Sequence, residues 1–204
     1  HLQAQLAERA GGDAERGAAM RAMKGGIDRA TRLASQLLAL AREEHAGLDV
    51  ARTDVDLAAL ARDVAREHAP IAAARDVDLG VTDAEPLVVA GDASALHTLL
   101  SNLVDNAVRY TPTGGRIDVS VSARDGAPAL VVRDTGPGIA ADERAHVFDR
   151  FVRGAHASAP GSGLGLAIVR RIAERHGATI RLEPGIDGAG LGVVVRFGGG
   201  AAAP

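Results

Sequence analysis

The sequence predicts a two-layer α/β (α+β) sandwich, a mixed sheet with helices on one face, preceded by a partial helical hairpin. Between residues 54 and 197, stretches with apolar residues three and four apart alternate with short segments in which every second residue is apolar. Residues 1 to 46 show only the helical spacing. Apolar residues make up 47% of the chain and aromatic residues only 2%, so Ala, Val, Leu and Ile must build the core.

Residues 1 to 46 are expected to form the C-terminal part of a helical hairpin. The break at Gly11-Gly12-Asp13 separates the end of one helix from a longer second helix. Apolar residues recur at helical spacing from Met20 to Ala41 and form a stripe that two helices alone cannot bury. Pairing with a second copy of the chain would cover this stripe, so we expect a homodimer. Residues 47 to 53 are expected to be a linker.

Helices in the following domain are predicted from apolar residues that fall on one face. The first is entered through Asp56, a residue type that caps helix N-termini, and the last is ended by Gly177, which suits a helix C-terminus. The second is the strongest pattern, with six apolar residues between Leu96 and Ala107. We expect helices over residues 54–74, 92–110 and 164–176, with a short additional helix around 142–148.

Strands are predicted where apolar residues alternate with polar ones. Gly114-Gly115 turns the chain into one such strand, and Asp125-Gly126 is a hairpin turn signal between that strand and the next. We expect strands over residues 77–81, 87–90, 116–123 and 130–132, and a final hairpin of 179–182 with 191–197. Residues 198 to 204 are expected to be a disordered tail.

Composition excludes several classes of function. The chain has no cysteine, which rules out disulfides and thiolate metal sites. Its formal net charge of −3 gives no general attraction to nucleic acid. No stretch approaches the ~18 consecutive apolar residues of a membrane span, and we expect no signal peptide in these residues. The chain begins at His1 in helix-like sequence, so we expect it to be a piece of a longer protein.

Three separated motifs supply the parts of a nucleotide site. Asn102-Leu-Val-Asp-Asn106 places two carboxamides one helical turn apart, both directed toward a metal or toward phosphate oxygens. Asp134-Thr-Gly-Pro-Gly138 places a carboxylate at a strand end beside a glycine turn. Gly161-Ser-Gly-Leu-Gly165 runs into an apolar helix, whose N-terminal amides can meet phosphate. The P-loop and dinucleotide fingerprints are absent, so ATP binding by another route is the leading interpretation.

In these residues the chain resembles the catalytic domain of sensor histidine kinases, in the ATPase superfamily shared with gyrase, Hsp90 and MutL. Four blocks stand in the family's order over roughly residues 53 to 197: an N box at 102–110, a G1 box at 134–139, an F box at 147–153 and a G2 box at 161–168. The resemblance implies that ATP and Mg²⁺ bind to residues of these blocks. They are Asn102, Asn106, Arg109, Tyr110, Asp134, Gly136, Gly138, Ile139, Phe151, Gly161, Ser162, Gly163, Leu164, Gly165 and Leu166.

The individual roles follow from chemistry together with that resemblance. Asn106, with Asn102 one turn earlier, offers hard carboxamide oxygens to Mg²⁺. Asp134 would accept the adenine amino hydrogens and so select ATP over GTP. Two assignments stay open: Tyr110 either packs along the nucleotide or is an ordinary core tyrosine, and Arg109 either reaches the phosphates or is solvated. Phe151, like Phe148, is either a core residue or the base of the lid over the nucleotide.

The reaction is expected to be phosphoryl transfer. In the hydrolytic relatives a Glu acts as general base at the position of Asn102, and an amide cannot accept that proton usefully at neutral pH. Arg150 and Arg153 are candidates for neutralising phosphate charge in the transition state. We therefore assign Asn102, Arg150 and Arg153 as catalytic.

The phosphorylated histidine of the family is missing from this sequence. None of the seven histidines stands in a His-Glu/Asp-x-x-Thr/Asn-Pro setting. The acceptor is therefore expected upstream of His1, and this fragment is expected to bind ATP without phosphorylating itself. The implied partner is a response regulator, which receives the phosphate on an aspartate. The implied place is the cytoplasmic side of the bacterial inner membrane, with attachment only through segments absent from this sequence.

A second class of function has to be weighed. A serine-kinase anti-sigma factor, or another ATP-gated binding module, has the same fold. These relatives generally lack both the preceding hairpin and the F box, so residues 1 to 46 and 147 to 153 favour the histidine kinase. An ATPase of the gyrase or MutL type is disfavoured by Asn102.

Overall fold

The computed structural model describes residues 52–152 and 162–198 and the five positions 17, 19, 20, 23 and 26. The chain divides into two compact units, His1–Ala41 and Arg42–Pro204. In the first unit the five described positions are helical, and Met20 is exposed. The rest of the predicted hairpin, the linker up to residue 51 and the tail beyond residue 198 lie outside the described residues, so the predicted boundaries stay predictions.

The second unit is built on a mixed five-stranded sheet in the order β2-β4-β5-β7-β6. β2 and β4 are parallel, and the other neighbouring strands are antiparallel. A separate two-stranded sheet pairs β1 with β3. The strands are β1 Thr53–Asp56, β2 Asp78–Ala84, β3 Val88–Gly91, β4 Arg116–Arg124, β5 Ala127–Asp134, β6 Thr179–Pro184 and β7 Leu191–Arg196.

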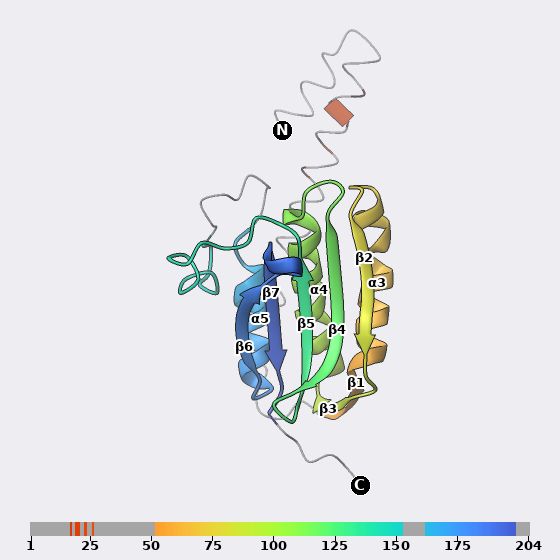
Figure 1. Cartoon of the computed structure of the whole chain (residues 1–204), viewed down its shortest axis with the longest axis vertical. Coiled ribbons are helices and arrows are strands. Elements are labelled where there is room, and N and C mark those ends of the chain that lie inside the picture. The colour runs from red at the N-terminus through yellow and green to blue at the C-terminus, as the bar shows by residue number, and fades with distance from the viewer. Residues whose placement is uncertain are drawn as a thin grey trace. The chain divides into compact units, whose positions relative to one another are not determined.

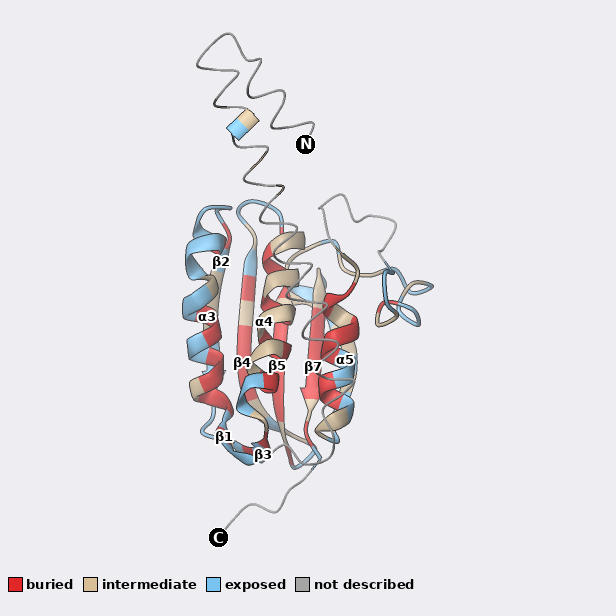
Figure 2. Cartoon of the chain, turned by 180° about the vertical axis from the view of Figure 1, so that it is seen from behind, coloured by how far each residue is buried: buried red, intermediate tan, exposed pale blue. Residues whose placement is uncertain are grey.

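Three helices cover one face of the sheet, α3 Leu57–Ala73, α4 Ala93–Tyr110 and α5 Gly165–Arg175 (Figure 1). Figure 2, seen from the helical side, shows that their buried faces turn toward the sheet. The fully buried side chains include Leu99 and Leu100 of α4 and Ile168 of α5, opposite Ile117 and Leu130 of the central strands. The predicted two-layer sandwich with helices on one face is therefore confirmed.

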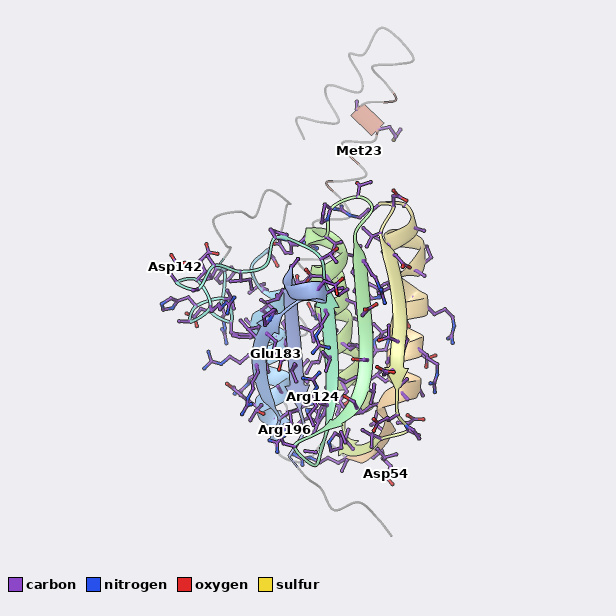
Figure 3. All side chains as sticks on the ribbon, in the orientation of Figure 1. Met23, Asp54, Arg124, Asp142, Glu183 and Arg196 are labelled. Carbon is purple, nitrogen blue, oxygen red and sulfur yellow. The ribbon has the colours of Figure 1, made fainter. Side chains whose placement is uncertain are left out.

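Charged side chains cover the other face of the sheet. Figure 3 shows Arg124, Glu183 and Arg196 there. Glu183 Oε2 lies 3.2 Å from Arg124 Nη1 and 3.1 Å from Arg133 Nη2. A small apolar cluster is buried on this face, where the long aliphatic stems of arginine and glutamate side chains can shield apolar atoms from water. Its members are Ala129, Val131 and Val194.

The predicted start of the first helix is wrong by three residues. Asp54 to Asp56 belong to strand β1, which pairs with β3 in the register Thr53↔Gly91. The helix begins only at Leu57, because the Asp56 carboxylate accepts hydrogen bonds from Ala58 N (2.8 Å) and from the next amide. A residue in this capping role has extended backbone geometry, which suits the end of a strand.

The predicted short helix around 142–148 is also wrong. The segment forms separate turns, each closed by a bond across three residues, such as Glu143 N to Ala140 O (3.0 Å) and His146 N to Glu143 O (3.0 Å). These bonds do not follow one another residue by residue as they do in a helix. Only Val147 of this segment is buried, so there is almost no apolar face to hold a helix against the domain.

Replacing Asp92 with alanine is expected to lower the free energy of unfolding by about 1–2 kcal/mol. Asp92 caps α4 by accepting a bond from Ala95 N (3.1 Å), and it pairs with Arg175 of α5 at 2.7 Å. Burial raises the pKa of Asp92, but these bonds outweigh it and leave the pKa below its ordinary value of 3.8. Denaturant unfolding at several pH values measures the effect.

The contribution of Asp92 must also depend on pH. A lowered folded-state pKa stabilises the protein above the unfolded pKa, and this stabilisation is lost as the pH falls through the folded pKa. The difference between the wild type and Asp92→Ala is therefore expected to shrink in acid. Asp63→Ala is the control, because Asp63 pairs with Arg66 on the exposed surface of α3 and should contribute little. Equal effects of both replacements would contradict this capping role.

Candidate functional site

Two carboxamides of α4 lie against the first residue of α5. Asn102 and Asn106 are one turn apart, and both are partly exposed. A Cβ atom at Gly165 would stand 3.3 Å from Asn102 Oδ1 and 3.4 Å from the amide atoms of Asn106. Asn102 Nδ2 donates to Thr98 O at 2.8 Å, which fixes the orientation of this amide. The glycine at the start of α5 thus allows both amides to approach that helix end closely.

The N-terminus of α5 has no side-chain cap. Its N-cap residue, Leu164, makes no side-chain capping hydrogen bond, and Leu164 N donates to Ser162 Oγ at 3.2 Å. Gly163 has a positive φ of 71° and approaches Phe151, whose N–H donates to Gly163 O at 2.9 Å. Among the described residues, the N-cap side chain does not cap this turn, and the first-turn amides of such a helix N-terminus favour anionic oxygens.

Asp134 stands at the end of β5 and is 7% exposed. Its Oδ1 accepts hydrogen bonds from Gly136 N at 2.7 Å and from Leu191 N at 3.2 Å. Burial raises the pKa of this carboxyl group, and the two backbone bonds act against that rise. A buried carboxylate whose only described partners are backbone amides is well suited to accept a further hydrogen bond from a ligand.

Glycine is required at two positions after Asp134 for different structural reasons. A Cβ atom at Gly136 would lie 2.8 Å from Asp134 Oδ1 and 3.1 Å from Tyr110 O. Gly138 has a φ of 72°, and a Cβ there would lie 2.9 Å from the carbonyl oxygen of Gly190. The turn after β5 therefore packs closely against both the end of α4 and the β6–β7 connection.

The remaining predicted residues do not all gather at this place. Arg109 pairs with Asp105 of its own helix at 2.7 Å and is largely buried. Tyr110 and Ile139 are partly exposed, while Phe151 is exposed and has a φ of 64°. Two predicted residues, Arg153 and Gly161, lie outside the described residues.

The β6–β7 connection was not among the predicted site residues. It runs through the short helix η1, Ile186–Gly188, and reaches Asp134 through Gly190 and Leu191. The sequence pattern predicts only a hairpin connection between β6 and β7. Its glycines at 185, 188 and 190 were the available signal.

The described part of the site offers few candidate metal ligands. Among the described residues, no group of three or more His, Cys, Asp or Glu side chains is placed to hold a metal ion. Mg²⁺ usually takes few protein ligands when substrate phosphates supply others. The carboxamide oxygens beside Gly165 fit such a site, because they are hard, neutral ligands adjacent to a phosphate-binding helix end.

Comparison with known proteins decides the family. Residues 91–198 match the model of histidine kinase-, DNA gyrase B- and HSP90-like ATPases. The chain belongs to this family. The match includes both the amides of α4 and the glycine-rich start of α5. Within the ATPase family, the relatives point to one branch.

The swarming motility regulation sensor protein RssA of Serratia marcescens is 38% identical over 176 residues, 85% of this chain and 37% of that protein. A structure of the mycobacterial sensor histidine kinase MprB has a TM-score of 0.65 and 35% identity, and covers 71% of this chain and 97% of that one. Full-length ShkA in complex with AMPPNP has a TM-score of 0.72 and 29% identity, over 96% of this chain and 41% of that one.

These matches show that this ATPase-family domain is the catalytic ATP-binding domain of sensor histidine kinases. The chain spans little more than a third of the length of RssA, 37%. In the part that the structure describes, no helix is both long and apolar enough to cross a membrane.

Proposed function

We propose that this chain is the ATP-binding catalytic portion of a protein-histidine kinase. It transfers the γ-phosphate of ATP to a histidine in a preceding segment, from which the phosphate passes to an aspartate of a response regulator. The observation that carries the proposal is the approach of Asn102 and Asn106 to Gly165 at the uncapped start of α5. This approach brings carboxamide oxygens, which can bind a metal ion, next to helix N-terminal amides, which can bind phosphate.

Adenine would be recognised at Asp134. Its Oδ1 already accepts two backbone bonds, which hold the carboxylate in place for a donor from the ligand. The amino group of adenine is such a donor, whereas the corresponding position of guanine carries a carbonyl oxygen and would repel the carboxylate. Gly136 and Gly138 support this role, because their lack of a side chain lets the turn pack against Asp134 and Gly190 and so hold the carboxylate in place.

The phosphates would lie between α4 and the start of α5. Gly163, Leu164 and Gly165 would present backbone amides, with Ser162, Leu166 and the undescribed Gly161 beside them. Asn106, with Asn102, would hold Mg²⁺, which when bound neutralises charge on the transferring phosphate. The AMPPNP complex of the related ShkA supports nucleotide binding by this fold.

Asn102 favours transfer over hydrolysis. Its amide donates to Thr98 O and carries no group that can take a proton from water at neutral pH. Arg150 and Arg153 would supply positive charge on the lid side, Arg150 from the turn segment before Phe151. Arg109 pairs with Asp105 in this structure. A contact between Arg109 and the phosphates would require bound nucleotide to break that pair.

The whole protein would act as a homodimer through the hairpin of residues 1 to 46. The support is the apolar stripe from Met20 to Ala41 and the exposure of Met20. The relatives are named sensor proteins and are much longer than this chain. This supports a membrane-attached sensor whose catalytic portion lies on the cytoplasmic side of the inner membrane.

Labelled phosphate distinguishes this proposal from its alternative. The whole protein, incubated with γ-phosphate-labelled ATP and Mg²⁺, is expected to carry label that acid removes, because a phosphorus–nitrogen bond is acid-labile. Residues 1–204 alone are expected to bind ATP and to remain unlabelled. Acid-stable label on this chain would instead support the serine-kinase alternative, and the absence of ATP binding would overturn both.

A further inference from the structure

The connection between β6 and β7 packs directly on Asp134. A Cβ atom at Gly185 would lie 2.1 Å from the carbonyl oxygen of Asp134, and one at Gly190 would lie 2.0 Å from the same oxygen. The Gly190 Cβ would also stand 2.7 Å from Asp134 Oδ1. Such separations are far below van der Waals contact, so only glycine fits at these two positions.

Two loops far apart in the sequence converge on one carboxylate oxygen. Gly136 N donates to Asp134 Oδ1 from the turn after β5, and Leu191 N donates to it from the start of β7, 57 residues away. The two loops also touch each other, because a Cβ at Gly138 would lie 2.9 Å from Gly190 O. The side chain of Asp134 is therefore fixed from both sides by backbone.

We propose that the turn Gly185–Gly190, together with the N–H of Leu191, is a positioning element for Asp134 and thereby sets the selectivity of the site for adenine. The inference rests on the proposed recognition of adenine by Asp134. The turn does not touch the base in this proposal. It holds the carboxylate in the orientation and the ionised state that accept the amino hydrogen.

The pKa of Asp134 distinguishes a positioning role of the turn from a purely structural one. Burial raises the pKa of Asp134, while the N–H groups of Gly136 and Leu191 lower it. Among the described residues, no charged side chain is a cause of this shift in pKa. The neighbouring Arg133 pairs with Glu183 on the opposite face of the sheet. Loss of the Leu191 bond removes one lowering cause, so the pKa of Asp134 must rise.

The sign of the pH dependence follows. A carboxyl group accepts the amino hydrogen well only when it is ionised, so ATP affinity must fall as the pH falls through the pKa of Asp134. When the Leu191 bond is lost while the carboxyl group stays buried, this loss must begin at a higher pH. A turn that served only the stability of the hairpin would leave the titration of Asp134 unchanged.

Gly190→Ala tests the proposal, and Gly188→Ala is its matched control. Both glycines lie in the same turn with nearly equal positive φ values, 74° and 80°. A Cβ at Gly188 meets nothing within 4 Å, whereas one at Gly190 strikes Asp134. The two replacements therefore share the backbone strain and differ only in the contact with Asp134.

The measurements are the pH titration of the Asp134 carboxyl carbon by NMR without nucleotide, and the affinities for ATP and for the analogue that lacks the 6-amino group. In Gly190→Ala, the Asp134 carboxyl group is expected to titrate at higher pH. The preference for ATP over the analogue is expected to fall about tenfold, which corresponds to the loss of one hydrogen bond. Gly188→Ala is expected to keep both properties. Leu191→Pro, which removes the N–H donor without adding a Cβ atom at position 190, should reproduce the shift if Gly190→Ala does not fold.

The outcomes separate the inference from the proposed function. An unchanged titration and selectivity in Gly190→Ala and Leu191→Pro, with ATP binding lost in Asp134→Ala, overturn the inference alone. Equal changes in Gly188→Ala and Gly190→Ala overturn it as well, because they point to strain and not to contact with Asp134. Full ATP affinity in Asp134→Ala overturns the proposed adenine recognition, and the inference with it.

Discussion

Asp134→Ala is expected to weaken ATP binding by about hundredfold or more, close to 3 kcal/mol. The loss combines the charge-assisted hydrogen bond to the adenine amino group with the removal of the partner of two backbone amides, Gly136 N and Leu191 N. Calorimetric titration of the folded variant with ATP measures the loss. Binding of inorganic triphosphate should change little, because the phosphates would lie at the start of α5.

The control for this replacement is Asp118→Ala. Asp118 stands on the neighbouring strand β4, pairs with Arg116 at 2.9 Å and belongs to the sheet face away from the helices. Its removal is expected to leave ATP affinity unchanged. An affinity of Asp134→Ala within about threefold of the wild type, less than 0.7 kcal/mol, would place adenine elsewhere in the domain.

The parts of the site that were predictable from the sequence depend on local spacing. Asn102 and Asn106 are four residues apart on a strongly amphipathic helix, so a shared direction follows from helix geometry alone. The start of α5 was likewise expected at Leu164, one residue before its observed start at Gly165, because a glycine-rich run precedes an apolar periodicity.

The parts that the sequence did not predict depend on distant contacts. Thr53–Asp56 has only one apolar residue, and its strand character comes from pairing with β3 more than thirty residues later. The turn at Gly185–Gly190 reaches Asp134 across about fifty residues, and a hairpin pattern does not reveal what its tip touches. The segment 142–148 has helix-forming residues, but its exposure removes the packing that would stabilise a helix.

Arg109 is a different case, because its partner lies on the same helix. Its position after the N box suggested a role at the phosphates, while the structure pairs it with Asp105. Acid and base four residues apart on a helix commonly pair, and the sequence already contained this spacing.

Asn106→Ala is expected to remove the dependence of ATP binding on Mg²⁺ and to lower phosphoryl transfer by the whole protein about hundredfold, close to 3 kcal/mol. No described carboxylate cluster can replace the lost carboxamide oxygen. Calorimetry with and without Mg²⁺, and labelling of the whole protein, measure the two effects. The control is Ser101→Ala on the same helix, since its hydroxyl lies 3.5 Å from His97 Nδ1 and is not among the proposed ligands. If Mg²⁺ still strengthened ATP binding in Asn106→Ala as in the wild type, the metal would have to be held by other residues. The approach of the α4 amides to Gly165 would then serve helix packing alone.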